Sequence, residues 1–382
     1  MGNNFREVHK EGIKSPLVTI LIPCFTFGGV QRVMIALANG LGHRGFSVRV
    51  VTLNVNGPLR NSLDEKIPIH DLAVANVRYR NSLLPLIKFF KQDDSDIFIS
   101  SLFNEPAMFA HALARNKSKI IATIHGSARN EIKVEKRKLV RLIAGIFSRL
   151  LLNRADAVVA VSNGVRDEIL LDRSIDPNKV HVIYNPVINE DSFAMIKEPT
   201  GHPWLGDRAY PLIMSVGRLS ASKGTDVLIK AFHILKKEVN ARLMIIGDGE
   251  EMINLKTLTE KLGLENYVAF PGFQKNPFAF MAKADLVALA SRTEGLPTIL
   301  IEAMFCGASI VSTDCPSGPR EILEDGRYGG LVKVDDIQGL ADAMKHALAY
   351  PMDKEMLRRR SLDFFEDAAL DKYAALLKKI AE

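Results

Sequence analysis

Short apolar runs rich in β-branched residues alternate with amphipathic stretches along most of the chain. Such alternation predicts parallel β-sheets covered by helices, because each strand must return over the sheet through a helix. In the first half we expect strands at Leu17–Pro23, Ser47–Leu53, Ile97–Ser100, Lys119–Ile124, Ala157–Val161 and Val180–Tyr184. In the second half we expect them at Leu212–Val216, Arg242–Ile246, Tyr267–Phe270, Leu286–Ala290, Ser309–Ser312 and Gly330–Val332.

The alternation is interrupted at Asn189–Tyr210, a polar segment with prolines, glycines and the only tryptophan, Trp204. We interpret it as a linker, since a chain of 382 residues favours two domains. Both halves open with a strand, a glycine-containing turn and a helix, as two Rossmann-like domains would. Ligands of open α/β sheets bind at the carboxyl ends of the strands, so a cleft between the domains is the expected site. The tail Lys354–Ala381 is predicted to be helical throughout.

The overall composition is that of a soluble globular protein, with 47% hydrophobic and 25% charged residues. The net charge of +6 is a mild basic bias that suits an anionic partner or membrane surface, and we expect no nucleic-acid partner. Cys24, Cys306 and Cys315 form no CxxC pair, which indicates reduced thiols in a cytoplasmic protein. The start Met1–Ser15 lacks the apolar region of a signal peptide, and no apolar run reaches the ~18 residues that span a bilayer.

Two glutamates in the second half are the strongest candidate site residues. Glu294 follows an apolar strand and should project from its carboxyl edge, and Glu302 lies about one turn into a helix that Pro297 begins. The helix start can hold an anion while carboxylates accept from sugar hydroxyls, so the pair suits a ligand with phosphates and hydroxyls. The alternative is that each glutamate only complements the helix dipole.

The loop Gly217–Gly224 lies between a predicted strand and a helix and carries the cations Arg218 and Lys223. Glycines at both ends would let the backbone approach a ligand. With the helix start after Pro297, these cations could hold a diphosphate without a metal. A surface loop with solvated charges is the alternative.

In the first half, Gly28 and Gly29 follow the first strand and could leave room for a sugar, although a plain tight turn fits equally. His125 ends a strand at the expected working edge of the sheet, where it is either structural or in contact with substrate. Gly247-Asp-Gly249 is weak evidence for a dinucleotide site. Asp94-Ser-Asp96 has the form of a metal-binding pattern but is interpreted as a solvated loop, and no metal site is predicted.

The segment Arg129–Arg154 combines a strong positive charge with regularly spaced apolar residues. A basic amphipathic helix of this kind can lie on an anionic membrane leaflet. A domain helix with a solvated basic face is the alternative. The membrane-contact candidates are Lys133, Lys136, Arg137, Lys138 and Arg141.

Taken together, Gly217-Arg-Leu with Lys223-Gly224, Gly247-Asp-Gly, Pro271-Gly-Phe and Glu294 with Glu302 resemble glycosyltransferase family 4. In the first half the resemblance continues in Gly28-Gly29, His125 and Ala155–Ser162, and Cys315–Glu321 resembles a branch of bacterial surface-glycan transferases. The family implies a GT-B fold, with residues 1–195 binding the acceptor and residues 205–360 the nucleotide sugar. It also implies that residues 361–382 form a helix that crosses back to the N-terminal domain.

The resemblance also implies roles for individual residues. Arg218 and Lys223 would hold the donor diphosphate, Glu302 the ribose, and Glu294 the transferred sugar. His125 would contact the sugar near the reacting carbon. The remaining donor-binding candidates are Gly28, Gly29, Phe273, Gln274, Gly295, Leu296, Pro297 and Thr298.

We therefore expect a retaining, metal-independent hexosyltransferase without a cofactor. It would use a nucleotide sugar, foremost a UDP-sugar, and a glycan or polyprenyl-linked acceptor at the cytoplasmic face of the inner membrane. The alternatives within enzymes are a GT-B sugar-nucleotide epimerase or a phosphorylase. A non-catalytic nucleotide-sugar-binding partner of a membrane assembly is the alternative outside enzymes.

Overall fold

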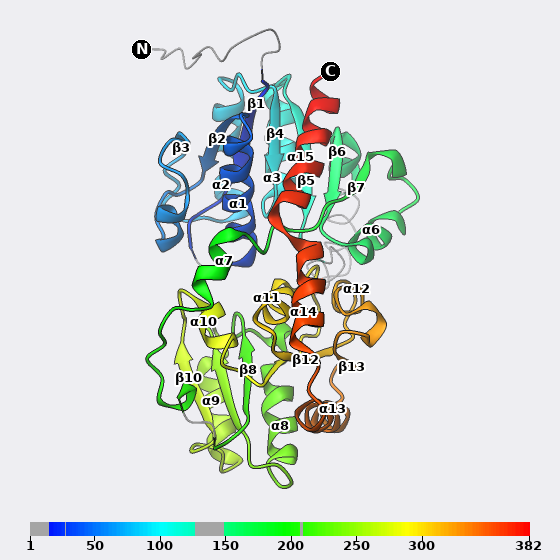
Figure 1. The fold of residues 1–382 in the computed structure, drawn as a ribbon. Coiled ribbons are helices and arrows are strands. Elements are labelled where there is room, and N and C mark those ends of the chain that lie inside the picture. The colour runs from blue at the N-terminus through cyan, green and yellow to red at the C-terminus, as the bar shows by residue number, and fades with distance from the viewer. Residues whose placement is uncertain (1–14, 27, 127–148, 207–208) are drawn as a thin grey trace.

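In the computed structural model the chain forms two parallel sheets, one above the other in Figure 1, and residues 15–26, 28–126, 149–206 and 209–382 are described. The first sheet has the order β3-β2-β1-β4-β5-β6-β7 and the second β10-β9-β8-β11-β12-β13. The strands of the first are β1 (Leu17–Leu21), β2 (Ser47–Thr52), β3 (Ile69–Asp71), β4 (Ile97–Ser100), β5 (Lys119–Ile124), β6 (Ala157–Ala160) and β7 (Val180–Val182). Those of the second are β8 (Leu212–Val216), β9 (Arg242–Ile246), β10 (Val268–Gly272), β11 (Leu286–Leu289), β12 (Ser309–Thr313) and β13 (Gly330–Val332).

Helices cover both faces of both sheets. The helices of the first half of the chain are α1 (Gly29–His43), α2 (Tyr79–Phe90), α3 (Asn104–Ala114), α6 (Asn163–Leu170) and α7 (Glu190–Met195). Those after the linker are α8 (Thr225–Leu235), α9 (Met252–Lys261), α10 (Pro277–Met281), α11 (Thr298–Cys306), α12 (Pro319–Ile322), α13 (Ile337–Ala349), α14 (Lys354–Ser361) and α15 (Glu366–Ala381). Short 3₁₀ turns include η4 (Ala221–Lys223) and η6 (Leu362–Phe364).

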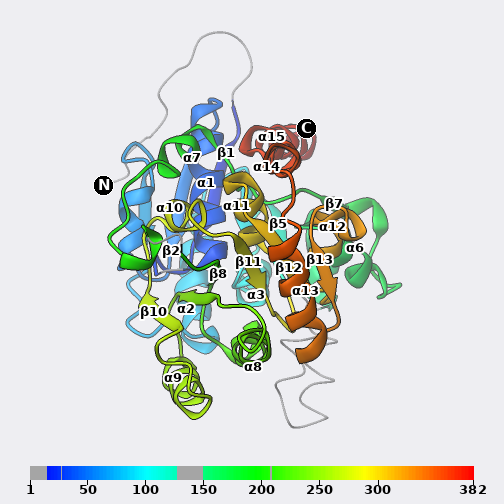
Figure 2. The ribbon, with the colours of Figure 1, turned by 60° about the horizontal axis from the view of Figure 1, so that its bottom comes forward.

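The predicted pair of Rossmann-like domains is confirmed. The alternation of side chains along each strand explains why each sheet has an apolar core on both faces. In β4, Ile97 and Ile99 join the cluster under α1 and α15, while Phe98 between them joins the cluster on the opposite face with α2 and α3. Side chains of a strand alternate between the faces, so a sheet covered on both sides needs a continuous apolar run. In the second sheet α8, α9 and α13 pack on one face, and in Figure 1 they lie at the bottom, away from the first sheet. Figure 2 shows α8 and α9 beside β8 and β10 from below.

Two local predictions were wrong. The strand β3 was missed, because Ile69–Asp71 is only three residues long and contributes a single apolar side chain to the edge of the sheet. The tail is not one helix: Phe365 is extended, with φ −67° and ψ 145°, and separates α14 and η6 from α15.

The break in the tail coincides with the return of the chain to the first domain. The backbone N–H of Glu366 donates to the carbonyl of Ile188 at 2.8 Å, and Ile188 and Phe365 form a parallel bridge. Leu370, Tyr373 and Leu377 of α15 are then buried with α1 in the core of the N-terminal domain, as Figure 1 shows along the upper sheet. The chain therefore passes between the domains at two places that lie side by side.

Candidate active site

The carboxyl ends of the strands of both sheets meet where the loop after β5 touches the loop after β11. A Cβ atom added at Gly295 would lie 2.1 Å from the carbonyl oxygen of His125, which is closer than such atoms approach in proteins. Only glycine fits there. His125 and Gly295 come from different domains, so this contact brings the predicted residues of the two halves to one place.

His125 directly follows β5 and lies at this meeting point. Both of its ring nitrogens are buried, and neither has a hydrogen-bond partner within the described part of the chain. Burial lowers the pKa of the imidazole to about 4, so the ring is neutral near pH 7. A buried polar group without a partner is costly. A ligand hydroxyl would therefore be bound with a net gain, since it could pair with a ring nitrogen.

Lys223 and Glu294 form an ion pair at the carboxyl edge of the second sheet. The ammonium of Lys223 lies 2.6 Å from Oε1 of Glu294, and the hydroxyl of Ser291 donates to the same oxygen at 2.7 Å. The side chain of Glu294 is 10% exposed and that of Lys223 is 30% exposed. Arg218 is exposed, and no hydrogen bond or ion pair engages its guanidinium among the residues that the structure describes. One cation is thus held in place and a second stands ready for an anion.

The loop that carries these cations is supported from beneath by Gly247-Asp-Gly249. A Cβ at Gly247 would lie 1.8 Å from the carbonyl oxygen of Gly217, and one at Gly249 would lie 2.3 Å from that of Leu219. The N–H of Leu219 donates to the carbonyl of Asp248 at 2.9 Å. These glycines serve the close approach of two loops, which accounts for the pattern without a dinucleotide site.

A third residue, Arg292, holds the same loop from the side. Its backbone N–H donates to the carbonyl of Ser222 at 2.8 Å, and its guanidinium pairs with Asp226 at 3.0 Å and Asp335 at 2.7 Å. These carboxylates raise the pKa of Arg292 against the effect of its burial. The charged loop is therefore fixed before any ligand arrives.

Glu302 lies in α11, one turn beyond Thr298. Burial raises the pKa of its carboxyl, and the charge of Arg32 from α1 and a hydrogen bond with Thr298 act in the opposite direction. Arg32 also donates to the carbonyl of Lys275 at 3.4 Å. The carboxyl of Glu302 thus lies between the domains, where ribose hydroxyls could bind to it.

The other donor-binding candidates surround this centre. Pro297 is the N-cap of α11 and Leu296 is buried. Phe273 is 36% exposed after β10, and the amide of Gln274 donates to the carbonyl of Pro271 at 3.1 Å. Gly29 opens α1, and an added Cβ there would meet nothing within 4 Å, whereas one at Gly28 would meet the side chain of Gln31 at 2.2 Å.

No pattern in the sequence indicated the contact that joins the domains beside this site. The carboxylate of Glu321 in α12 accepts from the backbone N–H of Asn163 at 2.9 Å and from the hydroxyl of Tyr184 at 2.6 Å. It therefore caps the N-terminus of α6 from the other domain. Burial and Glu321 raise the pKa of Tyr184 well above its usual range. We call Glu321, Asn163 and Tyr184 the interdomain cap.

Ser162 extends this contact to the loop of Gly295. Its hydroxyl donates to the carbonyl of Gly295 at 2.9 Å and accepts from the N–H of Val165 at 3.2 Å. Ala155–Ser162 and Cys315–Glu321 were singled out only by resemblance. The structure shows that the ends of both segments hold the domains together.

Cysteine chemistry adds nothing to the site. All three cysteines are free. Cys315 is buried near Glu294, and burial together with that carboxylate raises the pKa of its thiol to about 12. The thiol is therefore protonated near pH 7 and a poor nucleophile.

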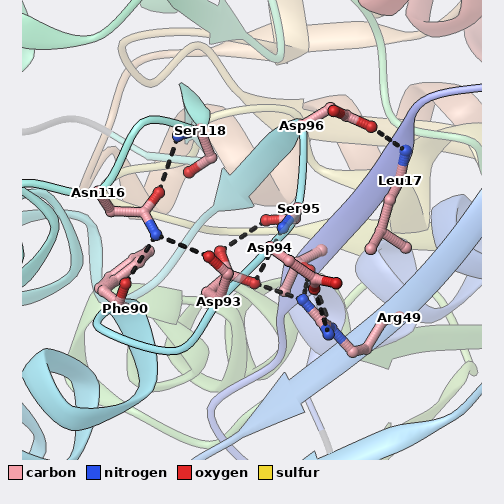
Figure 3. A network of polar contacts seen from close by, with 10 residues as sticks. Leu17, Arg49, Phe90, Asp93, Asp94, Ser95, Asp96, Asn116 and Ser118 are labelled. Atoms are coloured by element: carbon pink, nitrogen blue, oxygen red, sulfur yellow. Dashed lines mark hydrogen bonds and ion pairs between the residues drawn. The ribbon is translucent and has the colours of Figure 1, made fainter. Parts of the chain in front are cut away.

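The acidic pattern around Asp94 lies at the opposite, amino edge of the first sheet (Figure 3). Arg49 pairs with buried Asp93 and with Asp94 at 3.2 Å, and Asp96 accepts from the N–H of Leu17 at 2.8 Å. Asp94 and Asp96 are exposed, as the interpretation as a solvated loop predicted, whereas buried Ser95 bonds to the buried carboxylate of Asp93. Within the described ranges no group of three or more histidine, cysteine or acidic side chains could hold a metal.

The membrane-contact candidates Lys133, Lys136, Arg137, Lys138 and Arg141 lie outside the described residues. Among the helices that the structure does describe, none has both the length and the apolar character needed to cross a membrane.

Comparison with known families gives two matches that together span most of the chain. Residues 205–362 match the model of glycosyl transferases group 1, and residues 27–190 match that of glycosyltransferase family 4. The division between them falls in the predicted linker.

Individual relatives agree with these matches. A Campylobacter jejuni N-acetylgalactosamine-N,N'-diacetylbacillosaminyl-diphospho-undecaprenol 4-alpha-N-acetylgalactosaminyltransferase is 29% identical over 84% of this chain and 87% of its own. The Erwinia amylovora amylovoran biosynthesis glycosyltransferase AmsD is 26% identical over 79% and 81%. Among solved structures, Anabaena HepE in complex with UDP and glucose superposes with a TM-score of 0.77 at 21% identity, over 95% of this chain and 100% of the other.

Proposed function

We propose that this chain, which belongs to the glycosyltransferases of group 1 and family 4 with the GT-B fold, transfers a hexose or N-acetylhexosamine from a UDP-sugar. The acceptor is a glycan on a polyprenyl or other lipid carrier in surface-glycan synthesis. Support for the donor comes from the relative bound to UDP and glucose, and support for the acceptor from the relative named for a diphospho-undecaprenol substrate.

The observation that carries the proposal is the contact of Gly295 with His125, which brings the ion pair of Lys223 and Glu294 close to a histidine from the other domain. The ring nitrogens of that histidine have no partner among the described residues. When the bond between the sugar's anomeric carbon and the diphosphate breaks, negative charge develops on the leaving oxygen. Arg218, Lys223 and the N-terminus of α11 would stabilise it, because fixed cations and dipoles need no reorganisation in the transition state.

The neutral ring of His125 suits a hydrogen bond to a sugar hydroxyl near the reacting carbon, and Glu294 would accept from another. The acceptor oxygen would attack from the face that the diphosphate leaves, and its proton would pass to the leaving phosphate oxygen. The products are a glycoside of retained configuration and UDP. Closure of the domains around Gly295 would exclude water and limit hydrolysis.

We also propose that the transfer needs no metal. The donor diphosphate would receive its compensating charge from Arg218 and Lys223, which is the role a divalent cation plays in other transferases. Full activity in EDTA is the expected result, and recovery of activity only on addition of Mg²⁺ or Mn²⁺ would refute this part.

The place of action that we propose is the cytoplasmic face of the inner membrane, with the protein bound peripherally. Its support is the basic amphipathic pattern of residues 129–154. Liposomes containing anionic lipid should co-sediment the protein. The triple variant K136E/R137E/K138E should remain in the supernatant, and equal sedimentation of both proteins would exclude this surface.

The decisive test measures nucleotide release from UDP- and GDP-sugars in EDTA, with and without short-chain polyprenyl-diphosphate glycans. Acceptor-dependent release from one donor, with the anomeric configuration of the product determined by NMR, would establish the reaction and its stereochemistry. Epimerised donor without acceptor would indicate the epimerase, and phosphate-dependent cleavage of glycan the phosphorylase. Binding of UDP without any turnover would favour a non-catalytic partner.

A further inference from the structure

We propose that Ser291 is a positioning residue for the donor sugar, which turns the carboxylate of Glu294 so that its Oε2 atom faces a hydroxyl of that sugar. The hydroxyl of Ser291 donates to Oε1 of Glu294 at 2.7 Å, and the ammonium of Lys223 lies 2.6 Å from the same oxygen. Both donors of the protein thus engage one of the two carboxylate oxygens. The inference rests on the proposed transferase function and concerns the residue that orients its sugar-binding group.

The hydrogen bonds of Glu294 leave one oxygen for a ligand. An ionised carboxylate only accepts hydrogen bonds and has about two lone-pair positions on each oxygen. Lys223 and Ser291 use the positions on Oε1. Oε2 receives no hydrogen bond within the part of the chain that the structure describes, and the side chain keeps 10% of its surface exposed. A sugar hydroxyl that donates to Glu294 is therefore directed to Oε2.

Neither Glu294 nor Lys223 can set this orientation alone. The terminal torsion of a glutamate is broad and roughly two-fold, so the carboxylate can exchange its oxygens at little cost. The ammonium of Lys223 sits at the end of a flexible stem with three rotatable donors, and its side chain is 30% exposed. It could follow either oxygen. Ser291 is short and fully buried, so its hydroxyl approaches the carboxylate from one fixed position.

The backbone around Ser291 is locked on every side. Its carbonyl accepts from the hydroxyl of Thr313, the last residue of β12, at 2.5 Å. The N–H of the next residue, Arg292, donates to the carbonyl of Ser222 at 2.8 Å. The preceding carbonyl, that of Ala290, lies where a Cβ on Gly224 would come within 2.0 Å. The hydroxyl of Ser291 is thus held in place before a ligand arrives.

A fixed orientation of Glu294 gives the site a means to select its sugar. Hydrogen bonds weaken steeply when donor and acceptor are misaligned, so an acceptor aimed in one direction favours a hydroxyl at one position of the ring. A site built to bond a substrate hydroxyl also rejects an analogue that lacks it, because the buried acceptor is then left unpaired. Ser291 contributes to this selection without touching the sugar itself.

The test is calorimetric titration of the full-length protein with UDP and with UDP-glucose, UDP-galactose and their N-acetylhexosamine counterparts, in the absence of acceptor. The sugar nucleotide that binds most tightly is then compared with its 3-deoxy, 4-deoxy and 6-deoxy analogues. In the wild type one analogue should bind about tenfold more weakly or worse, which is the scale of a hydrogen bond to a charged group. In Ser291→Ala this loss should shrink to less than about threefold, while the affinity for UDP stays unchanged.

Two further variants separate the hydrogen bond from the packing of the side chain. Ser291→Cys keeps the shape of the side chain but donates only weakly, so it should discriminate as poorly as Ser291→Ala. Ser82→Ala is the matched control, since it also removes a fully buried hydroxyl, which donates to the carbonyl of Tyr79 at 2.7 Å in α2. It should discriminate between the sugar nucleotides as the wild type does.

The outcomes distinguish this inference from the proposed function. If Ser291→Ala retains the full discrimination of the wild type, the serine does not orient Glu294, and transfer can still stand. The inference also fails if no analogue binds more weakly in the wild type, or if Ser291→Ala weakens UDP and every sugar nucleotide alike. Absence of turnover with any acceptor would count against the transferase, and discrimination that depends on Ser291 would still support the inference. A wild type that binds no sugar nucleotide would refute both.

Discussion

The two sides of the candidate active site are prepared for their ligands in different ways. On the side of the second sheet, Lys223, Glu294 and Ser291 satisfy one another, and glycine contacts fix the loop beneath them. On the side of the first sheet, His125 has buried nitrogens without partners among the described residues, and Gly29 borders open space. The first arrangement holds charge in place before the donor binds. The second leaves polar groups and room that only a ligand satisfies.

The largest effect is expected when the fixed cation, Lys223, is removed. Lys223→Ala should lower kcat/KM about 10³-fold, since the charge on the leaving diphosphate loses its stabilisation. The variant should fold normally, because the lysine is partly exposed. Nucleotide release under single-turnover conditions measures the effect. Lys345→Ala, which removes a lysine from the exposed pair with Glu238, should retain full activity, and a similar loss in both variants would deny Lys223 a special role.

The buried imidazole of His125 predicts a dependence of stability on pH. The pKa of His125 is lowered to about 4, so between pH 6.5 and 4 the unfolded state binds a proton that the folded state does not. Stability from this group is full above pH 6.5 and is lost as the pH falls, by on the order of 3 kcal/mol at pH 4. In urea unfolding, the wild type should therefore lose stability relative to His125→Leu as the medium is acidified. Parallel pH profiles would show that the ring is accessible to protons in the folded protein.

The contact between Gly295 and the carbonyl of His125 can be disrupted by adding a single methyl group. Gly295→Ala places a methyl group against the carbonyl of His125, so the domains cannot close fully. We expect a 10- to 100-fold loss of kcat/KM, about 2 kcal/mol of lost positioning. Gly201→Ala adds the same methyl group where nothing lies within 4 Å and should leave activity unchanged. Small-angle scattering would report the more open shape, and unchanged kinetics in Gly295→Ala would mean that closure plays no part.

The smallest effect is expected at the interdomain cap. Tyr184→Phe removes one hydrogen bond to the carboxylate of Glu321 and should lower the free energy of unfolding by about 1.5 kcal/mol. Because Asn163 still donates to Glu321, the domains should remain closed and activity should change less than threefold. Tyr328→Phe offers a matched loss of a hydroxyl elsewhere in the second domain. A large loss of activity in Tyr184→Phe alone would give the cap a larger part in closure than its hydrogen bond implies.

The parts of the fold that could be predicted are those with a local signal. Apolar runs located the strands of both sheets except β3, and Glu294 and His125 were placed at strand ends because their strands were recognised. The pairing of Lys223 with Glu294 was not visible, since the two are 71 positions apart and only the sheet brings them together. The bond from Asn163 to Glu321 spans 158 positions and carries no pattern at all. The break at Phe365 was hidden because the amphipathic pattern continues through it.

The double passage of the chain at Ile188 and Phe365 has a mechanical consequence. Two neighbouring backbones joined by a hydrogen bond resist twisting and sliding more than a single strand does. If the domains open, the two segments would act as a hinge, and the domains would rotate about the line that the segments share. Closure after such an opening would return Gly295 to the same carbonyl of His125, so the register between the halves would be kept. Cleavage in the loop after α7 would leave both halves attached through the second segment.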